Sequence, residues 1–457
     1  MRIYNTLSKK IDEFKPINPP SVGMYSCGMT VYDYAHIGHG RKYVMDDCLR
    51  RALSYLGYKV KHVENVTDVG HLSSDEDSGE DKLEKGAEKS GMDVWQTAEF
   101  FTKDFYESMD KLNILRPDII ARATDHIKEQ VELVERLVKN GFAYDTPEAV
   151  YFDVSKDPHY TEFSGQKLED KETGARSEVN VGEHKKNPAD FVLWFKRVGH
   201  FKDHIMHWPS PWGDGFPGWH IECSAMSMKY LGETFDIHTG GIDHISVHHT
   251  NEIAQSFGAT GKPLANFWVH SEFLMVDDSK MSKSIGNAYR ITDIEERGFS
   301  PLSLRYFYLG AHYRTKLNFT WQALEGASNA YNKLARAVRE LPDGGKPDLA
   351  YLAEFKNALE NDLNTPEALA LLWQLLKDDL LASTKKATLL EFDKVLGFGL
   401  ADLKKEEIPE DIKKLAKMRE DARKNKNFEE SDKLRKEIED AGYEIKDTVG
   451  GQKIVKI

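Results

Sequence analysis

Cysteine is scarce in this sequence: Cys27, Cys48 and Cys223 are the only three among 457 residues. Three thiols cannot form a disulfide framework, and a chain of this length can bury an ample hydrophobic core without one. No Cys-x-x-Cys pair occurs, so the spacing typical of a zinc finger is excluded. This cysteine usage indicates a reducing compartment, the cytoplasm.

Long apolar runs and internal repeats are also missing. No stretch reaches the length of a membrane span, and Met1 to Leu7 lack the shape of a signal peptide. The composition, 40% apolar and 30% charged, is that of a soluble globular protein of roughly two to four domains, with no membrane partner. The formal net charge of −13 argues against broad, non-specific nucleic-acid binding, but it leaves room for a local basic face toward one RNA.

A strand, a loop, a helix and a second strand follow one another near the N-terminus. The apolar run that ends at Cys27 leads into a loop with His36-Ile-Gly-His39, and a helical pattern follows from Met45 to Leu56. Gly57 stands where a helix ends, before a strand over residues 59–66. A helix start presents unpaired N–H groups and a positive dipole end, which favour phosphate. The histidines could equally serve as helix caps, and the motif alone leaves both interpretations open.

A lysine-rich loop, Lys280-Met-Ser-Lys283-Ser-Ile-Gly-Asn287, follows much later in the chain. Two flexible ammonium groups suit a clamp for a polyphosphate leaving group, although such a loop by itself is usually a solvated turn. In this order, His-Ile-Gly-His and Lys-Met-Ser-Lys-Ser resemble the paired signatures of class I aminoacyl-tRNA synthetases. The resemblance implies that His36 and His39 contact the triphosphate of ATP, and that Lys280 and Lys283 stabilise the charge on the departing pyrophosphate.

Four residues suit a metal ion. His248 and Glu252 are four residues apart, so a helix would place them on one face, although such pairs often lie on the surface without a ligand. Cys27 and Cys223 are the other soft donors near predicted strand ends, whereas Cys48 falls within a predicted helix and is expected to pack in the core. Two thiolates, one imidazole and one carboxylate would together suit zinc.

Longer stretches resemble the cysteinyl-tRNA synthetase family. They are Tyr25–Asp33, Gly218–Met226, Phe235–Asp243 and His248–Ala254, and the likeness continues through Thr365–Ala368 and Ala422–Arg435. The resemblance implies that Cys27, Cys223, His248 and Glu252 hold one Zn²⁺ ion, which binds the thiolate of the substrate. Pocket shape discriminates small groups by only roughly 1–3 kcal/mol, whereas a thiolate is a far better soft ligand than the neutral hydroxyl of serine.

The resemblance also implies the remaining contacts of the pocket. Around the amino acid it places Gly28, Thr67, Trp219 and His238. Two of these have plainer alternatives, since Thr67 could be a turn residue and Trp219 a core aromatic. Against the nucleotide it places Gly240, Gly241 and Asp243, where glycine lets the backbone approach and the carboxylate accepts hydrogen bonds from ribose hydroxyls. Mg²⁺ is expected on the phosphates of ATP.

The sequence departs from the family pattern at four places. Thr250 stands where glutamate is common, which leaves His248 and Glu252 in place. Asp277-Asp278 precedes Lys280 where a glycine turn is common, so the mobility of the loop is expected to differ. The acidic run from Asp75 to Asp81 is expected to be a solvated loop, and the C-terminal tail lacks a tryptophan.

The predicted fold is α/β: a Rossmann-type nucleotide-binding catalytic domain with an inserted connective domain, followed by an all-α helical bundle and a small C-terminal domain. The expected segments are residues 1–117 (first catalytic half), 118–190 (connective insertion), 191–270 (second catalytic half with the zinc site), 271–323 (lysine loop and stem-contact region), 324–405 (tRNA-binding bundle) and 406–457 (anticodon-binding domain).

Helix signals refine this plan. Helices are expected over residues 93–113 and 124–140, the second with Thr124 as its N-cap and Gly141 as its stop. In the bundle, Thr365 is expected to cap a helix that begins with proline. Between Lys413 and Lys426, seven basic side chains stand against two acidic ones, which is typical either of a solvated helix face or of RNA contact.

The predicted activity is that of a cysteine–tRNA ligase. Cysteine and ATP would give cysteinyl-adenylate and pyrophosphate, and the acyl group would then pass to the 3′-terminal ribose of tRNA(Cys). No residue need act as a covalent nucleophile, because positioning and electrostatics supply the rate. The expected partners are ATP, cysteine and tRNA(Cys), and the protein is expected to be a monomer.

Two alternatives remain open from the sequence. A cysteine ligase with the same catalytic core could act on an amino sugar, but the residues after Leu324 argue against it, because a small acceptor needs no basic terminal domain. A non-catalytic RNA-binding relative is disfavoured by the intact histidine and lysine signatures.

Overall fold

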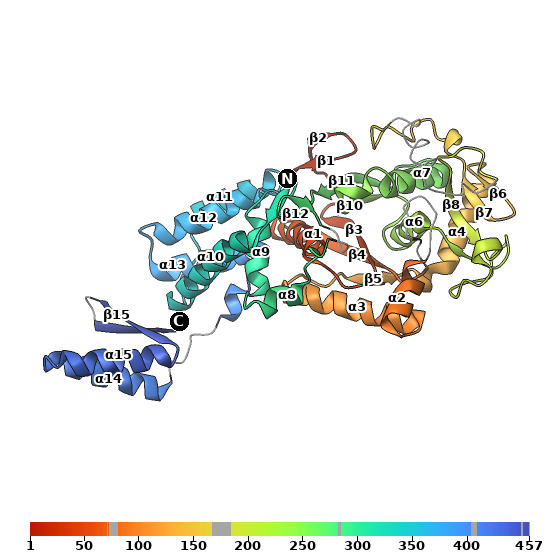
Figure 1. Ribbon diagram of the computed structural model, residues 1–457. Helices are drawn as coiled ribbons and strands as arrows, with labels where there is room; N and C mark the ends of the chain where they lie inside the picture. Colours follow the sequence, from red (N-terminus) through yellow and green to blue (C-terminus); the bar gives the residue numbers. More distant parts are fainter. Residues whose placement is uncertain are drawn as a thin grey trace. The chain divides into compact units, whose positions relative to one another are not determined.

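The computed structural model describes residues 1–70, 72, 81–166, 184–281, 285–403, 409–448 and 451–456 (Figure 1). The chain divides into two compact units, residues 1–401 and 402–457, and each is described by itself. Lys283 and the acidic residues 75–80 lie outside the described residues. No helix in the described part of the chain is both long and apolar enough to cross a membrane.

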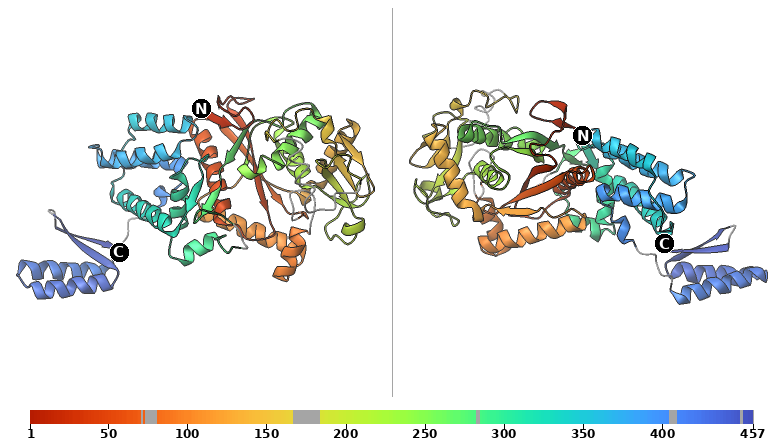
Figure 2. Two further views of the ribbon diagram at one scale, coloured as in Figure 1. Left: turned by 45° about the horizontal axis from the view of Figure 1, so that its top comes forward. Right: turned by 180° about the vertical axis from the view of Figure 1, so that it is seen from behind.

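Five parallel strands form the central sheet of the first unit, in the spatial order β11-β10-β3-β4-β5. In chain order they are β3 (Ser21–Thr30), β4 (Lys59–Thr67), β5 (Ile119–Arg122), β10 (Phe235–Gly241) and β11 (Ala265–Ser271). The chain builds outward from β3 to β5 and later adds β10 and β11 on the other side of β3 (Figures 1 and 2). Where the strand order reverses, here between β3 and β10, a crevice opens at the carboxyl ends of the strands.

Helices connect these strands and cover the sheet. They are α1 (Ile37–Tyr55) between β3 and β4, α2 (Lys82–Ser90) and α3 (Val94–Lys111) between β4 and β5, α6 (Trp219–Leu231) before β10, and α7 (His248–Thr260) between β10 and β11. The successive residues Met24, Tyr25 and Ser26 of β3 are all unexposed, so both faces of the sheet are covered. The predicted strand–helix–strand unit is confirmed, with Gly57 at φ 93° just after α1.

A second sheet, antiparallel and in the order β6-β7-β8-β9, lies between β5 and α6 in the sequence. Its strands are β6 (Ala143–Asp145), β7 (Ala149–Phe152), β8 (Phe191–Lys196) and β9 (Gly215–Pro217). In the described residues of this region the helices are η1 (Thr124–His126), α4 (Ile127–Lys139), η2 (Val154–Lys156) and η3 (Gly199–Phe201). A core of buried side chains from β7 and β8, including Trp194, packs this sheet against helices α4, α6 and α7.

Two expected boundaries of the insertion differ from the observed strands. β5 lies within the range 118–190 but is the edge strand of the central sheet. The second catalytic half is expected to begin at residue 191, but β8, which starts there, pairs antiparallel with β7 and β9 and does not join the central sheet. A short continuous apolar run is buried on both faces in either kind of sheet, so its pattern does not identify its partners.

The first unit is mainly helical after residue 290. Its helices are α8 (Ile291–Glu296), α9 (Pro301–Leu309), α10 (Trp321–Glu340), α11 (Leu349–Glu360), α12 (Thr365–Lys377), α13 (Ala382–Leu396) and the short η5 (Leu400–Asp402). Two small sheets complete it: β1 (Arg2–Asn5) with β2 (Lys10–Glu13), and β13 (Ser279–Lys280) with β12 (Leu274–Val276) and β14 (Leu317–Phe319). The lysine loop therefore begins on a strand of the second of these sheets.

Two predicted helix caps are wrong in position. Thr124 does not cap α4: it begins η1, and its N–H and hydroxyl donate to the Asp68 carboxylate at 2.9 and 2.8 Å. In the bundle, Asn364 caps α12 one residue before Thr365, because its side chain accepts the Glu367 N–H. Several neighbouring residues can each cap a helix, so tertiary partners decide which one does.

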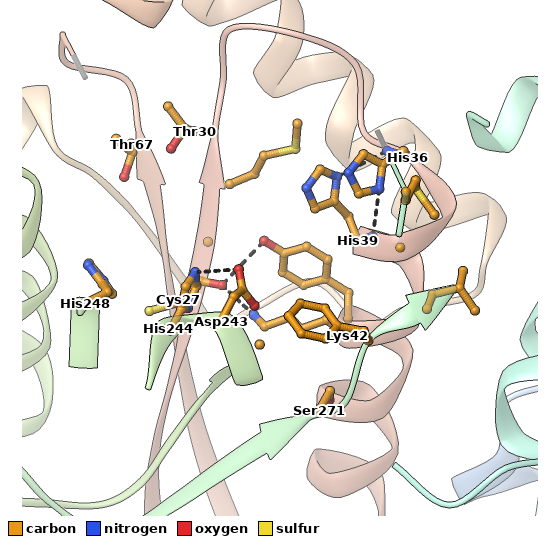
Figure 3. A pocket seen from close by; sticks show the side chains of 18 of the residues that line it. Cys27, Thr30, His36, His39, Lys42, Thr67, Asp243, His244, His248 and Ser271 are labelled. Carbon is orange, nitrogen blue, oxygen red and sulfur yellow. Dashed lines mark hydrogen bonds and ion pairs between the residues drawn. The ribbon is translucent and has the colours of Figure 1, made fainter. Parts of the chain in front are cut away.

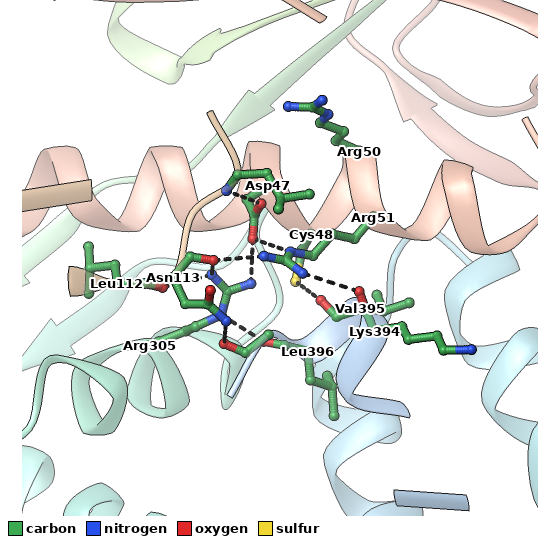
Figure 4. Close-up of polar contacts among 12 residues, drawn as sticks. Asp47, Cys48, Arg50, Arg51, Leu112, Asn113, Arg305, Lys394, Val395 and Leu396 are labelled. Carbon is green, nitrogen blue, oxygen red and sulfur yellow. Dashed lines mark hydrogen bonds and ion pairs between the residues drawn. The ribbon is translucent and has the colours of Figure 1, made fainter. Parts of the chain in front are cut away.

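A buried ion pair joins α1 to α9. The Asp47 carboxylate accepts hydrogen bonds from Arg305 at 2.5 Å and from Arg51 Nε at 2.8 Å, and neither the Asp47 nor the Arg305 side chain is exposed (Figure 4). The two guanidinium groups also donate to carbonyls at the ends of α3 and α13, those of Leu112, Asn113, Lys394 and Leu396. The last carbonyls of a helix lack partners within it, and the helix dipole attracts cations there. One carboxylate and two helix ends therefore hold two arginines.

The second unit is two helices and a hairpin: α14 (Glu410–Lys424), α15 (Phe428–Asp440), β15 (Tyr443–Thr448) and β16 (Gly451–Lys456). Ile412, Ala416, Ile438 and Ile445 form its core. The basic stretch predicted from the sequence lies mostly on α14, but Arg419 is only 3% exposed and pairs with Asp447 at 3.0 Å. Arg419 therefore holds the hairpin to α14 rather than facing solvent.

Glu64 of β4 is a buried carboxyl group whose Oε1 accepts the Tyr106 hydroxyl at 3.2 Å. Burial raises the pKa of Glu64 from 4.5 to about 7, although Lys42 opposes the shift. The pKa is higher in the folded chain than in the unfolded one. The stability that this group contributes is therefore fully present below pH 4.5 and is lost as the pH rises through 7.

We expect Glu64→Gln to remove this pH dependence. The variant should match the parent near pH 4.5 and exceed its free energy of unfolding at pH 8 by roughly 3 kcal/mol, because each pKa unit corresponds to about 1.4 kcal/mol. Urea unfolding at the two pH values measures the difference, with the exposed Glu135→Gln as a control. A difference that is the same at both pH values would contradict this expectation.

Candidate active site and metal centre

A cavity of about 630 Å³ opens at the carboxyl ends of β3, β4, β10 and β11 (Figure 3). The predicted site residues that line it are Cys27, Gly28, His36, His39, Thr67, Trp219, Cys223, Gly241, Asp243, His248 and Lys280. His238, Gly240 and Glu252 are buried and do not line the cavity. Lys283 lies outside the described residues.

The two histidines of the first signature cap α1 through each other. The His36 Nδ1 accepts the His39 N–H at 3.3 Å, the His39 Nδ1 accepts the His36 N–H at 3.2 Å, and the rings stack 3.6 Å apart (Figure 3). The capping interpretation is therefore correct. Both rings also line the cavity, so the cap does not exclude contact with phosphate. Because the caps use Nδ1, a phosphate at this helix start would be met by the Nε2 atoms.

The two signatures lie against each other. The Ile37 N–H donates to the Tyr289 carbonyl at 2.8 Å, and a Cβ atom on Gly38 would lie 3.3 Å from Met281 Cε. The Tyr308 hydroxyl of α9 donates to the Ile37 carbonyl at 2.6 Å, which ties the same helix start to the helical part of the unit. Lys280 therefore belongs to the same cavity as the histidines.

The turn that carries Lys280 is a two-residue hairpin. Asp277 and Asp278 have φ of 48° and 59°, and Val276 pairs with Ser279 across them. Such turns need the left-handed conformation, which favours glycine or asparagine over other residues. Asn318 of β14 holds the turn, since it accepts the Asp278 N–H at 2.9 Å and donates to the Asp278 carboxylate at 2.8 Å. The hydrogen bonds from Asn318 therefore stabilise a turn in which aspartate stands where the family commonly has glycine.

Four candidate metal ligands meet at the inner end of the cavity. One donor atom each from Cys27, Cys223, His248 and Glu252 lies within 4.8 Å of the others, and all four residues are buried. These residues are far apart in the sequence, but the fold brings them together: Cys27 lies in the second half of β3, Cys223 on α6, and His248 and Glu252 on one face of α7. Two thiols, an imidazole and a carboxylate at this separation fit a tetrahedral ion of the zinc type.

Burial and neighbours set the charges of this cluster. Burial opposes ionisation of Cys223, but Cys27 and His248 outweigh it and lower the pKa of Cys223 to about 6. Burial lowers the pKa of His248, but Glu252 and Cys223 outweigh that effect and raise the pKa to about 10. The neighbouring His238 and His248 hold the pKa of Glu252 well below its usual range despite its burial. Two negative groups thus share one protonated imidazole, and a divalent cation would take the place of that proton.

A second set of potential ligands overlaps the first. Cys27, His238, His249 and Glu252 also lie within 4.8 Å of one another. His238 and Glu252 do not line the cavity, and neither does His249, whereas three of the four residues in the first set do. An ion that keeps a coordination position open to a substrate needs ligands on the cavity side. The first set is therefore the better candidate.

Histidines behind the first set hold its members in place. His238 Nε2 lies 2.6 Å from Glu252 Oε2, and His220 Nδ1 lies 2.9 Å from His248 Nδ1. Metal ligands are commonly oriented by such outer hydrogen bonds. His238 therefore acts on the Glu252 carboxylate, not on the cavity directly. His220 was missed from the sequence because nothing in its spacing distinguishes it from other helical histidines.

Gly28 lies at a bulge of β3 where only glycine fits. The register between β3 and β4 shifts between Ser26 and Met29, and a Cβ atom on Gly28 would lie 1.5 Å from the Asn65 carbonyl oxygen. The Gly28 N–H donates to Asn65 Oδ1 at 2.7 Å. The bulge turns the end of β3 toward the cavity, and Asn65, also missed from the sequence, fixes it.

Thr67 ends β4 and links the bulge to α6. Its hydroxyl accepts from Asn65 Nδ2 at 3.2 Å and donates to Glu222 Oε2 at 2.9 Å. Burial raises the pKa of Glu222 well above the usual range. Thr67 therefore has both a structural role and a position on the cavity wall, and Trp219 likewise lines the cavity while its ring stacks 4.3 Å from that of His248.

Two family models match the chain. Residues 13–329 match tRNA synthetases class I (C) catalytic domain, and residues 405–454 match the Cysteinyl-tRNA ligase anticodon binding domain.

Solved structures show the same fold. One is a Mycobacterium tuberculosis methionyl-tRNA synthetase in complex with methionyl-adenylate (TM-score 0.56, 17% identity, 83% of this chain and 90% of that chain). The other is Agrobacterium radiobacter K84 agnB2 LeuRS in a ternary complex (TM-score 0.60, 11% identity, 86% of this chain and 85% of that one). The catalytic-domain family model covers more than half of the sequence. The chain is therefore a class I aminoacyl-tRNA synthetase, the class that the two signatures beside the cavity also indicate.

Curated relatives narrow the class to one family. A cysteine–tRNA ligase of Treponema denticola is 45% identical over 98% of this chain and 98% of its own length. Cysteine–tRNA ligase 1 of Burkholderia lata is 46% identical over 99% of this chain and 96% of its own, and a Thermus thermophilus cysteine–tRNA ligase is 42% identical over 98% of both. The chain belongs to the cysteine–tRNA ligase family. The amino-sugar alternative gains no support from these relatives.

Proposed function

We propose that this protein activates cysteine with ATP and transfers it to the 3′-terminal ribose of tRNA(Cys). One observation carries the proposal: a buried cluster of two thiols, an imidazole and a carboxylate opens into the same cavity as the histidine and lysine signatures. A thiol-bearing amino acid at the cluster would then have its carboxylate directed along the cavity toward the phosphates. Family membership supports the same activity.

At the phosphate end, we assign His36, His39, Lys280 and Lys283 to the triphosphate and Mg²⁺ to its oxygens. The start of α1 supplies the positive end of its dipole and the two imidazole rings, since the His36, Ile37 and His39 N–H groups already have partners. The lysines are assigned to the charge that builds up on the leaving pyrophosphate. Gly240, Gly241 and Asp243 are assigned to the nucleoside, since they stand at and just after the end of β10.

At the amino-acid end, Cys27, Cys223, His248 and Glu252 would hold a zinc ion. A bound zinc ion would supply a soft Lewis acid that distinguishes a thiolate from a serine hydroxyl. Gly28, Thr67 and Trp219 would contact the amino acid from the cavity wall. His238 would keep the Glu252 carboxylate oriented and ionised through its 2.6 Å contact.

For the tRNA, we propose that residues 271–323 contact the stem, that the bundle of residues 324–405 also binds the tRNA, and that residues 406–457 bind the anticodon. The connective insertion between the two catalytic halves would begin after β5 and include β8 and β9, because these strands belong to the second sheet. The match of residues 405–454 to an anticodon-binding domain supports the last segment. We also propose a cytoplasmic monomer, consistent with three buried cysteines that form no disulfide.

Two assays test the proposal. The first is ATP–pyrophosphate exchange, which we expect with cysteine and not with serine. The second is charging of total tRNA, which we expect to yield cysteinyl-tRNA. No cysteine-dependent exchange would exclude the proposed enzyme, and exchange without any charged tRNA would exclude tRNA as the acceptor.

A further inference from the structure

We propose that Lys316 binds the β- and γ-phosphates of ATP and the pyrophosphate product, as a third lysine of the phosphate end. This inference rests on the proposed function, because it concerns the same cavity. Lys316 lies just before β14, far from either signature in the sequence, and nothing in its spacing marks it. It lines the cavity together with His36, His39 and Lys280.

Strand pairing places Lys316 and Lys280 on opposite sides of β12. Lys280 of β13 pairs with Met275, while Leu317 of β14 pairs with Leu274, so Lys316 comes level with Phe273. Lys280 Nζ lies 6.0 Å from the Phe273 ring centroid, and Phe273 itself lines the cavity. The two positions are two strand spacings apart, roughly 10 Å, and are offset by two residues along β12, roughly 7 Å, so they lie roughly 12 Å apart. Two lysine side chains can close this distance around a diphosphate.

The backbone around Lys316 is fixed to α1. Arg41, only 1% exposed, donates to the carbonyls of Phe273 and Thr315, and the Leu317 N–H donates to the Phe273 carbonyl at 3.3 Å. The helix that begins with His36 and His39 therefore also holds the strand end that bears Lys316. Lys280, in contrast, follows a two-residue turn at the tip of a hairpin.

The charge of Lys316 is available to a ligand. Its side chain is exposed, and in the described part of the chain it forms no ion pair with a carboxylate. A lysine that is unpaired and faces a cavity for a polyanion gains more from the ligand than from solvent, because hydrogen bonds to charged groups are stronger than neutral ones. The backbone of Lys316 is fixed and its ammonium group is available. We therefore infer that Lys316 binds ATP and pyrophosphate equally well, and not only the transition state between them.

The test separates this role from that of the signature lysines. We expect Lys316→Ala to raise the KM for ATP in the exchange reaction, and the KM for pyrophosphate in the reverse reaction, by roughly tenfold. The KM for cysteine should stay within about twofold and kcat within about threefold, since uniform binding affects KM alone. Lys316→Arg should keep both KM values near those of the parent, and it provides a second variant of the same site.

Lys346→Ala is the matched control, because Lys346 is exposed and does not line the cavity. The inference is overturned if Lys316→Ala leaves both phosphate-ligand KM values within twofold, if the cysteine KM rises equally, or if Lys346→Ala has the same effect. It is also overturned if Lys316→Arg loses as much as Lys316→Ala. If the parent enzyme shows no cysteine-dependent exchange, the proposed function itself fails, which is a separate result.

Discussion

Cys223→Ser is expected to leave a folded protein that no longer retains zinc and no longer prefers cysteine. The substitution removes the thiol whose pKa is about 6, the group of the cluster best suited to bind a soft cation as a thiolate. Three donors remain, Cys27, His248 and Glu252. We expect the metal content to fall from one ion per chain to background, and cysteine activation to fall by at least about 100-fold, because even outer-sphere changes alter metal sites by 10- to 100-fold.

Elemental analysis of the purified protein and exchange with cysteine and serine measure the two effects. The ratio of serine to cysteine activation should rise, because only pocket shape would then discriminate between them. Cys48→Ser is the matched control: Cys48 is equally buried but donates to the Val395 carbonyl between α1 and α13, away from the cavity. A Cys223→Ser protein with full metal content and unchanged selectivity would remove zinc from the account of substrate recognition.

Asp47→Ala is expected to have the largest effect on stability. It leaves the buried Arg305 guanidinium and the Arg51 guanidinium without their carboxylate (Figure 4). Breaking a buried ion pair from one side typically costs about 3–5 kcal/mol, because an uncompensated charge stays buried. Since whole proteins are stable by only about 5–15 kcal/mol, this loss is a large fraction of the free energy of unfolding.

Chemical unfolding of Asp47→Ala and Asp47→Asn measures this cost. The amide of asparagine can still accept from one arginine, so it should lose less. Glu391→Ala is the control, since Glu391 pairs with Lys394 on the surface and such pairs contribute about 0–1 kcal/mol. Equal losses for Asp47→Ala and Glu391→Ala would mean that the junction of α1, α3, α9 and α13 does not depend on the buried charges.

Apolar spacing and glycine positions in the sequence predicted where helices and strands begin and end. The helix after His36 and the end of α1 at Gly57 follow from apolar spacing and from a glycine with positive φ. The partners of a strand were harder to predict. The expected second catalytic half begins at residue 191, yet β8, which starts there, belongs to the antiparallel sheet, because burial on both faces does not identify a neighbouring strand. The cap at Thr124 failed for the same reason, since its hydroxyl found a tertiary partner in Asp68.

The site shows the same division. Motifs and resemblance found residues that reach the cavity from strand ends and helix starts, among them Cys27 and His36. The motifs and the resemblance did not identify residues that hold a cavity residue in position without lining the cavity as a predicted contact. Asn65 holds the bulge at Gly28, and His220 orients His248, yet both look ordinary in the sequence. Such roles arise from distances that exist only once the chain has folded.

The position of β10 beside β3 has a consequence for synthesis on the ribosome. Until residue 241 has emerged, β3 has β4 on one side and an open edge on the other. An unpaired edge in a partly made chain is prone to pair with other chains. The nascent protein therefore carries an aggregation-prone edge until β10 pairs with β3, and the Cys27 thiol gains its neighbours His249 and Glu252 only later, when α7 forms.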